Sequence, residues 1–146
     1  ILALFGAPVA KADDSARAIA CALAMQAEMD AINARNIADG LPSIDIGIGI
    51  NTGEVVAGNI GSKKRAKYGV VGHAVNVTSR IEDQTLPGEI LVAKSTLDAC
   101  SLACKLGREI ELHPKGVSEI IDVSAVESID IPTSGQPPQF DSAGEK

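Results

Sequence analysis

The clearest alternation of apolar and polar positions runs from Ile44 to Ile50. Isoleucine occupies every second position, and Asp45 and two glycines lie between them. A period of two is typical of a β-strand with one buried face. The glycines leave the other face without side chains, so a helix or a ligand can approach the backbone there. The pattern therefore predicts a strand over residues 44–50 with a close neighbour.

The residues that follow predict a hairpin and then a helix. Residues 51–53, Asn-Thr-Gly, are typical of a turn, and residues 54–60 have the composition of a returning strand. We expect that strand to pair with residues 44–50 as a hairpin. A short strand is expected over residues 68–71, and a helix from about Ala74.

Apolar spacing predicts the remaining elements. Residues 11–34 have apolar positions at i, i+3 and i+4, which is typical of an amphipathic helix, and Asp13 or Asp14 is a suitable N-cap. Residues 1–8 have the pattern of a buried strand that ends in a turn. Four later elements are expected: a strand over 89–92, a helix over 94–104 with Ser95 as a possible cap, and strands over 108–112 and 119–126. Residues 131–146 are expected to form a flexible tail.

Composition narrows the functional classes. The chain has 146 residues, which suits one domain, and its 45% hydrophobic but only 2% aromatic content predicts a core of Ile, Val, Leu and Ala. A net charge of −6 argues against non-specific nucleic-acid binding. Lys63, Lys64, Arg65 and Lys67 form a local basic run, which is either a solvated loop or a phosphate clamp.

The three cysteines do not predict a disulfide framework. Cys100 and Cys104 are four residues apart on the expected helix, but two cysteines without further ligands are a weak metal signal. We interpret them, together with Cys21, as small apolar packing residues. No stretch has the pattern of a signal peptide or a transmembrane span, so a cytoplasmic location is expected.

Two polar residues on one predicted helix are candidates for chemistry. Asn76 and Arg80 are four residues apart, so they share a helix face. An amide and a fixed cation beside a helix N-terminus would form a candidate anion site. The alternative is that Asn76 only holds loop backbone by hydrogen bonds.

The same residues carry a family resemblance. The segment IGIGINTGEVVAGNIGS is followed by YGVVGHAVNVTSRIE, in which Gly72, Val75, Asn76 and Arg80 follow the pattern Gly-x-x-Val-Asn-x-x-x-Arg. Together they resemble the catalytic domain of bacterial class III nucleotidyl (adenylate/guanylate) cyclases, from Ile1 to about Val126. The resemblance implies an α/β (α+β) fold with a ferredoxin-like cyclase core, in which helices pack on a mainly antiparallel sheet, and a domain of residues 1–130.

The resemblance also implies a reaction and residue roles. The family forms 3′,5′-cyclic AMP and pyrophosphate from ATP by attack of the 3′-hydroxyl on the α-phosphorus. The residue matching Asn76 orients the ribose or the ring-closing phosphate, and the residue matching Arg80 stabilises the developing charge. Lys115 matches a lysine that reaches the terminal phosphates. The alternative is that Lys115 is only an exposed lysine in a turn. Gly69 stands where many adenylyl cyclases carry an aspartate or threonine that reads the purine, so GTP stays open as the substrate.

Cofactors and partners are implied in the same way. The family uses Mg²⁺ or Mn²⁺, and the resemblance places its two aspartate ligands before Ile1, so this chain is expected to lack them and to be inactive alone. The family acts as a head-to-tail homodimer with active sites at the interface, and an upstream regulatory domain is expected in the parent. Two other classes remain: a non-catalytic module that binds nucleotide or dimerises, and an unrelated α/β scaffold.

Overall fold

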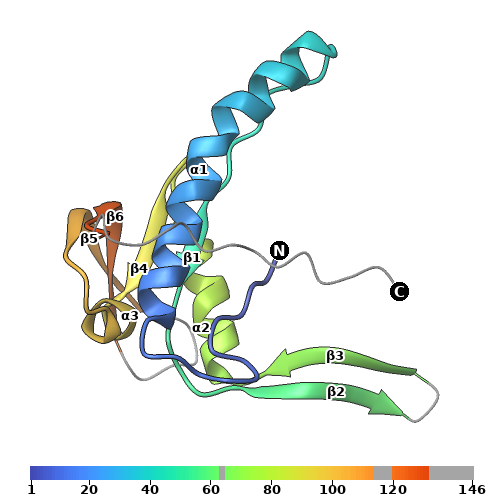
Figure 1. Cartoon of the computed structure of the whole chain (residues 1–146), viewed down its shortest axis with the longest axis vertical. Helices are drawn as coiled ribbons and strands as arrows, with labels where there is room; N and C mark the ends of the chain where they lie inside the picture. Colours follow the sequence, from blue (N-terminus) through green and yellow to red (C-terminus); the bar gives the residue numbers. More distant parts are fainter. Residues whose placement is uncertain (63–64, 114–119, 132–146) are drawn as a thin grey trace.

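The computed structural model describes residues 1–62, 65–113 and 120–131, and Figure 1 shows how the elements are arranged. The described helices and strands are α1 (Asp14–Ala38), β1 (Ile48–Ile50), β2 (Val56–Ser62), β3 (Arg65–Val71), α2 (His73–Glu82), β4 (Ile90–Ala93), α3 (Lys94–Ala99), β5 (Cys104–Leu112) and β6 (Ile121–Ile129). The expected tail lies outside the described residues from residue 132 onward.

Strand pairing confirms a mixed fold with a mainly antiparallel sheet. Four strands form one sheet in the order β1-β4-β6-β5. Strand β1 is parallel to β4, whereas β6 is antiparallel to both β4 and β5. Strands β2 and β3 pair with each other as a separate antiparallel hairpin that projects from the body of the molecule (Figure 1).

The core lies on both faces of the four-stranded sheet, because every residue of β4 is buried. Leu91 and Ala93 pack in one cluster with residues of α2. Ile90 and Val92 pack in a second cluster with residues of α1. Successive side chains of a strand point to opposite faces, so α1 and α2 cover opposite faces of the sheet. A continuous apolar run such as that of β4 is typical of a strand that is covered on both sides.

Helix α2 packs directly on backbone that carries no side chains. Three positions that face α2 and the residues following it are glycines: Gly47, Gly49 and Gly53. A Cβ added at Gly49 would lie 2.6 Å from the backbone nitrogen of Glu82, and one at Gly53 would lie 2.7 Å from Cβ of Ala74. The close neighbour expected from the glycine pattern is therefore a helix.

The expected hairpin of residues 44–50 with 54–60 is wrong. Strand β1 is shorter than expected and pairs with β4, and β2 pairs with β3 instead. Because Gly53 lies against the first turn of α2, residues 51–53 carry the chain past that helix and do not reverse it. Ile44 precedes the strand and is 47% exposed.

The expected strand over residues 1–8 is also wrong. This segment has no strand pairing in the described part of the chain, and Ile1, Leu2 and Leu4 are exposed. An apolar pattern indicates a preference for burial but does not specify a partner strand. The segment leads into α1, where the Phe5 ring centroid lies 5.9 Å from Cζ of Arg17.

The third helix is shorter than expected. Helix α3 ends at Ala99, and Cys104 begins β5, opposite Ile129 of β6. Pairing with β6 therefore overrides the helical pattern expected up to residue 104. Ser95 does not cap the helix, since the N-cap is Ala93 and has no side-chain hydrogen bond.

An ion pair joins β5 to the residues that precede β4. Arg108 donates from Nε and Nη2 to the two carboxylate oxygens of Glu89, at 3.0 and 2.7 Å. Nη2 also donates to the carbonyl oxygen of Gln84, and the Glu89 carboxylate accepts the backbone N–H of Leu86. The hydrogen bond from Arg108 lowers the pKa of Glu89, although burial of the carboxyl group opposes this shift.

Acidification is expected to remove the stabilisation that Glu89 provides. Because its folded-state pKa is lowered, this contribution is complete above the ordinary glutamate pKa of about 4.3 and is lost as the pH falls through the lowered value. Glu89→Gln is therefore expected to be less stable than the unsubstituted chain at pH 7, and the difference is expected to shrink toward pH 3. The difference in stability is measured from the urea unfolding midpoints of the two proteins at pH 7 and at pH 3. An equal difference at both pH values would contradict the expectation.

Candidate functional site

Helix α2 has one face on the sheet and one face open to solvent. Gly72 precedes the helix as its N-cap. Val77 and Ile81 are buried in the core cluster, and Asn76 and Arg80, each one position earlier, are exposed. The four-residue spacing repeats the same relation one turn later. The two apolar anchors thus fix the helix that presents Asn76 and Arg80 outward.

In the described part of the chain, nothing supports a structural hydrogen bond for Asn76. Among the described residues, no partner accepts from or donates to its side chain, and the side chain is exposed. The alternative interpretation required Asn76 to hold loop backbone. Asn51 has that role here, since its Nδ2 donates to the carbonyl oxygen of Ala74 at 3.2 Å. The amide of Asn76 is therefore available to a ligand.

Arg80 is held only weakly by its neighbour. Its Nη1 lies 3.4 Å from Oδ2 of Asp83, and the two side chains are 63% and 50% exposed. Such exposed pairs contribute about 0–1 kcal/mol, so the guanidinium is free to exchange Asp83 for a phosphate. Arg80 lies in the last turn of α2. Asn76 lies in the first turn and Arg80 lies about two turns from the start of α2, so the N-terminal end of the helix dipole adds little at Arg80.

Of the two expected substrate-binding residues, the structure describes Gly69 but not Lys115. Gly69 lies in β3 opposite Gly58 of β2, so neither strand has a side chain at this level of the hairpin. Lys115 lies outside the described residues, as do Lys63 and Lys64 of the basic run. Their roles stay predictions.

A polar junction that sequence reasoning missed connects α2 to α3. Asn51 uses both ends of its amide, because Oδ1 accepts a hydrogen bond from Oγ of Ser95 at 3.1 Å while Nδ2 donates to Ala74. Beside it, the hydroxyl oxygens of Thr52 and Thr96 lie 2.9 Å apart, and Thr96 is 1% exposed. The sequence indicated only a turn here. Without the fold, no spacing relates Asn51 to the two helices.

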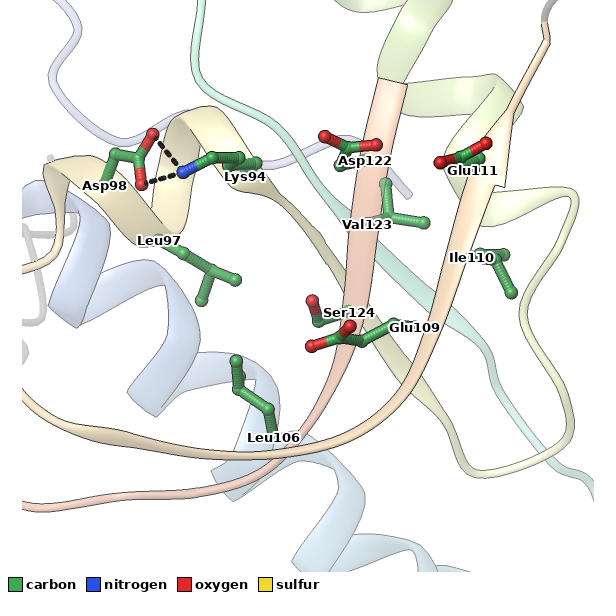
Figure 2. A pocket seen from close by; sticks show the side chains of 10 residues that line it. All are labelled: Lys94, Leu97, Asp98, Leu106, Glu109, Ile110, Glu111, Asp122, Val123 and Ser124. Carbon is green, nitrogen blue, oxygen red and sulfur yellow. Dashed lines mark hydrogen bonds and ion pairs between the residues drawn. The ribbon is translucent and has the colours of Figure 1, made fainter. Parts of the chain in front are cut away.

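A cavity of about 640 Å³ lies between α3 and strands β5 and β6 (Figure 2). Its lining includes four carboxylates, those of Asp98, Glu109, Glu111 and Asp122. The ammonium group of Lys94 is engaged with both oxygens of Asp98, at 2.6 and 2.9 Å. A polyphosphate is strongly anionic and would be repelled by this lining. The cavity is therefore not assigned to a nucleotide.

The described residues do not form a metal centre. In residues 1–62, 65–113 and 120–131, no three His, Cys, Asp or Glu side chains come together in a way that could hold a metal ion. The expected position of the metal ligands before Ile1 stays a prediction.

Sequence comparison identifies one family. Residues 2–123 match the family model described as the adenylate and guanylate cyclase catalytic domain. Adenylate cyclase 1 of Rhizobium meliloti (strain 1021) is 32% identical over 128 residues, which are 86% of this chain and 19% of that protein. The chain thus spans about a fifth of the length of the curated relatives it matches.

Solved structures give the same result. The guanylyl cyclase Cya2 is similar with a TM-score of 0.83 and 41% identity, over 89% of this chain and 66% of that chain. The adenylyl cyclase CyaB from P. aeruginosa is similar with a TM-score of 0.70 and 26% identity, over 85% of this chain and 65% of that chain. In the described part of this chain, no helix is both long enough and apolar enough to cross a membrane.

Proposed function

Because the chain belongs to the adenylate and guanylate cyclase catalytic-domain family, we propose that it forms part of an enzyme that cyclises a purine nucleoside triphosphate. The products are a 3′,5′-cyclic nucleotide and pyrophosphate. The observation that carries the proposal is the exposed pair Asn76 and Arg80 on a helix whose other face is buried. Phosphoryl transfer depends on positioning and charge stabilisation, which groups on a rigid element provide well.

The proposed roles follow from the chemistry of the two side chains. The 3′-hydroxyl oxygen attacks the α-phosphorus and releases its proton to solvent, and the bond from that phosphorus to the pyrophosphate oxygen breaks. Negative charge spreads over the phosphoryl oxygens, where the planar guanidinium of Arg80 donates two hydrogen bonds that a lysine could not match. Asn76 orients the ribose or the reacting phosphate. The family's divalent metal enters here only as an assay requirement.

ATP is the first candidate substrate, in line with the 32% identical adenylate cyclase. GTP is a second candidate, and two observations favour it. The 41% identical structure is a guanylyl cyclase. Gly69 and Gly58 also face each other without side chains, so the hairpin offers no aspartate or threonine with which to read adenine.

We also propose that the enzyme acts as a homodimer in the cytoplasm. Apolar and aromatic side chains of the hairpin are exposed, including Val56 at its base, at 69%, and Tyr68 in the middle of β3, at 62%. They lie on strands next to the start of α2, so a second copy covering them would also approach Asn76. Light scattering of the chain and of a Val56→Lys/Tyr68→Lys variant tests this proposal. A monomer in both cases would contradict it.

Nucleotide turnover tests the main proposal. A parent protein, meaning one that contains this chain together with the family's metal-binding residues, is incubated with Mn²⁺ and either ATP or GTP. We expect cyclic nucleotide and pyrophosphate in equal amounts, and no cyclic product from a 3′-deoxy nucleotide, which lacks the attacking hydroxyl. Residues 1–146 alone are expected to give no product. A folded, dimeric parent that converts neither nucleotide would favour a non-catalytic module that binds nucleotide or dimerises.

A further inference from the structure

The turn between α3 and β5 brings two cysteines together. Cys100 is the C-cap of α3 and Cys104 is the first residue of β5, so they do not share a helix as the sequence pattern predicted. Both thiols donate to one acceptor, the carbonyl oxygen of Leu102, with Sγ–O distances of 3.6 and 3.8 Å. A single oxygen atom therefore holds both sulfurs on the same side of the turn.

The pair packs against an apolar part of the core. Both cysteines are half-buried and pack against the core cluster that contains Ile19 of α1, which confirms their expected packing role. Burial is the main cause that raises the pKa of Cys104, and the neighbouring Cys100 raises it further. The third cysteine, Cys21, lies in α1 and is also a free thiol.

We propose that Cys100 and Cys104 form a reversible oxidation site, at which hydrogen peroxide converts the two thiols into an intramolecular disulfide. One thiol loses its proton, and its sulfur attacks a peroxide oxygen, so that the O–O bond breaks, a sulfenic acid forms and one water leaves. The second sulfur then attacks the sulfenic sulfur, the S–S bond forms, and the hydroxyl group leaves as a second water. Two thiols are oxidised while one peroxide is reduced to two waters.

Either sulfur can take the sulfenic acid and the other can resolve it, because one carbonyl oxygen holds both sulfurs on the same side of the turn.

Peptide mapping of the 146-residue chain tests the proposal directly, independently of any cyclase activity. Lys94 and Lys105 flank the pair, so trypsin releases residues 95–105 with both cysteines and residues 18–35 with Cys21 alone. After hydrogen peroxide and alkylation, we expect the 95–105 peptide to have lost two hydrogen atoms and to carry no alkyl group. Dithiothreitol should restore two alkylation sites. The Cys21 peptide should remain alkylated at the same peroxide dose.

Single substitutions separate the two cysteines. Cys104→Ser should leave Cys100 as a sulfenic acid that dimedone traps, whereas the control Cys21→Ser should form the disulfide as the unsubstituted chain does. The proposal is overturned if the 95–105 peptide stays fully alkylated while Cys21 is oxidised, or if oxidation gives only cross-links between chains. Should Cys104→Ser fail to fold by circular dichroism, the peptide map of the unsubstituted chain decides the question.

Discussion

A parent protein with Arg80→Ala is expected to form cyclic nucleotide about 10² to 10³ times more slowly than the unsubstituted protein. Removing one preorganised donor from a charged transition state has an effect of this size. The loss should fall mainly on kcat, because the charge that Arg80 neutralises develops during the reaction. Arg80→Lys should recover only part of the rate, since an ammonium group keeps the charge but not the two-pronged geometry.

Stability and a matched variant separate this effect from misfolding. The contact of Arg80 with Asp83 is exposed, so Arg80→Ala should change the free energy of unfolding by less than about 1 kcal/mol. Arg35→Ala removes an exposed arginine from α1 and should leave turnover unchanged. Wild-type kcat in Arg80→Ala would remove Arg80 from the proposed chemistry, and an equal loss in both variants would point to a general charge effect.

Gly49→Ala is expected to destabilise the chain by about 1–3 kcal/mol, the usual effect of overpacking. The new Cβ would lie 2.6 Å from the backbone nitrogen of Glu82, which no side-chain rotation can move away. Either β1 or α2 must therefore shift. A shift of α2 would also move Asn76 and Arg80, so the same substitution in a parent protein should lower turnover.

Gly58→Ala is the matched control. It makes the same change in a strand, but its Cβ would meet no atom within 4 Å. Its effect is expected to stay within about 0.5 kcal/mol. The stabilities of Gly49→Ala and Gly58→Ala are compared by urea unfolding, followed by far-ultraviolet circular dichroism. The midpoints are compared only if the slope of the transition is the same in both variants. Equal midpoints for the two variants would contradict direct packing of α2 on the β1 backbone.

Sequence patterns predicted which face of a strand is packed better than they predicted which strands pair with each other. The alternation over residues 44–50 correctly indicated a strand with a close neighbour on its glycine face. It did not indicate that β1 would pair in parallel with β4, because side-chain period depends on burial and not on which strand supplies the hydrogen bonds. The same limit explains why residues 1–8 were expected as a strand. Antiparallel pairing with β6 similarly set the start of β5 at Cys104, where the local pattern favoured a helix.

The candidate site was also only partly predictable from the sequence. The four-residue spacing of Asn76 and Arg80 was enough to predict that they share a helix face. The structure adds that this face is exposed, because Val77 and Ile81, one position after each of them, are buried. The spacing could not show that Arg80 lies in the last turn beside Asp83. Asn51 could not be identified because its two partners, Ala74 and Ser95, lie on helices whose relative position only the folded sheet determines.

The projecting hairpin implies that part of the chain can unfold locally while the four-stranded sheet stays folded. In the described residues, β2 and β3 pair only with each other, with Ala57 opposite Val70, and join no third strand. A lone two-stranded hairpin is only marginally stable in water. Its amide hydrogens should therefore exchange with solvent through local opening, while those of β4 wait for global unfolding. Slower hairpin exchange would then be the earliest sign that a second copy has docked.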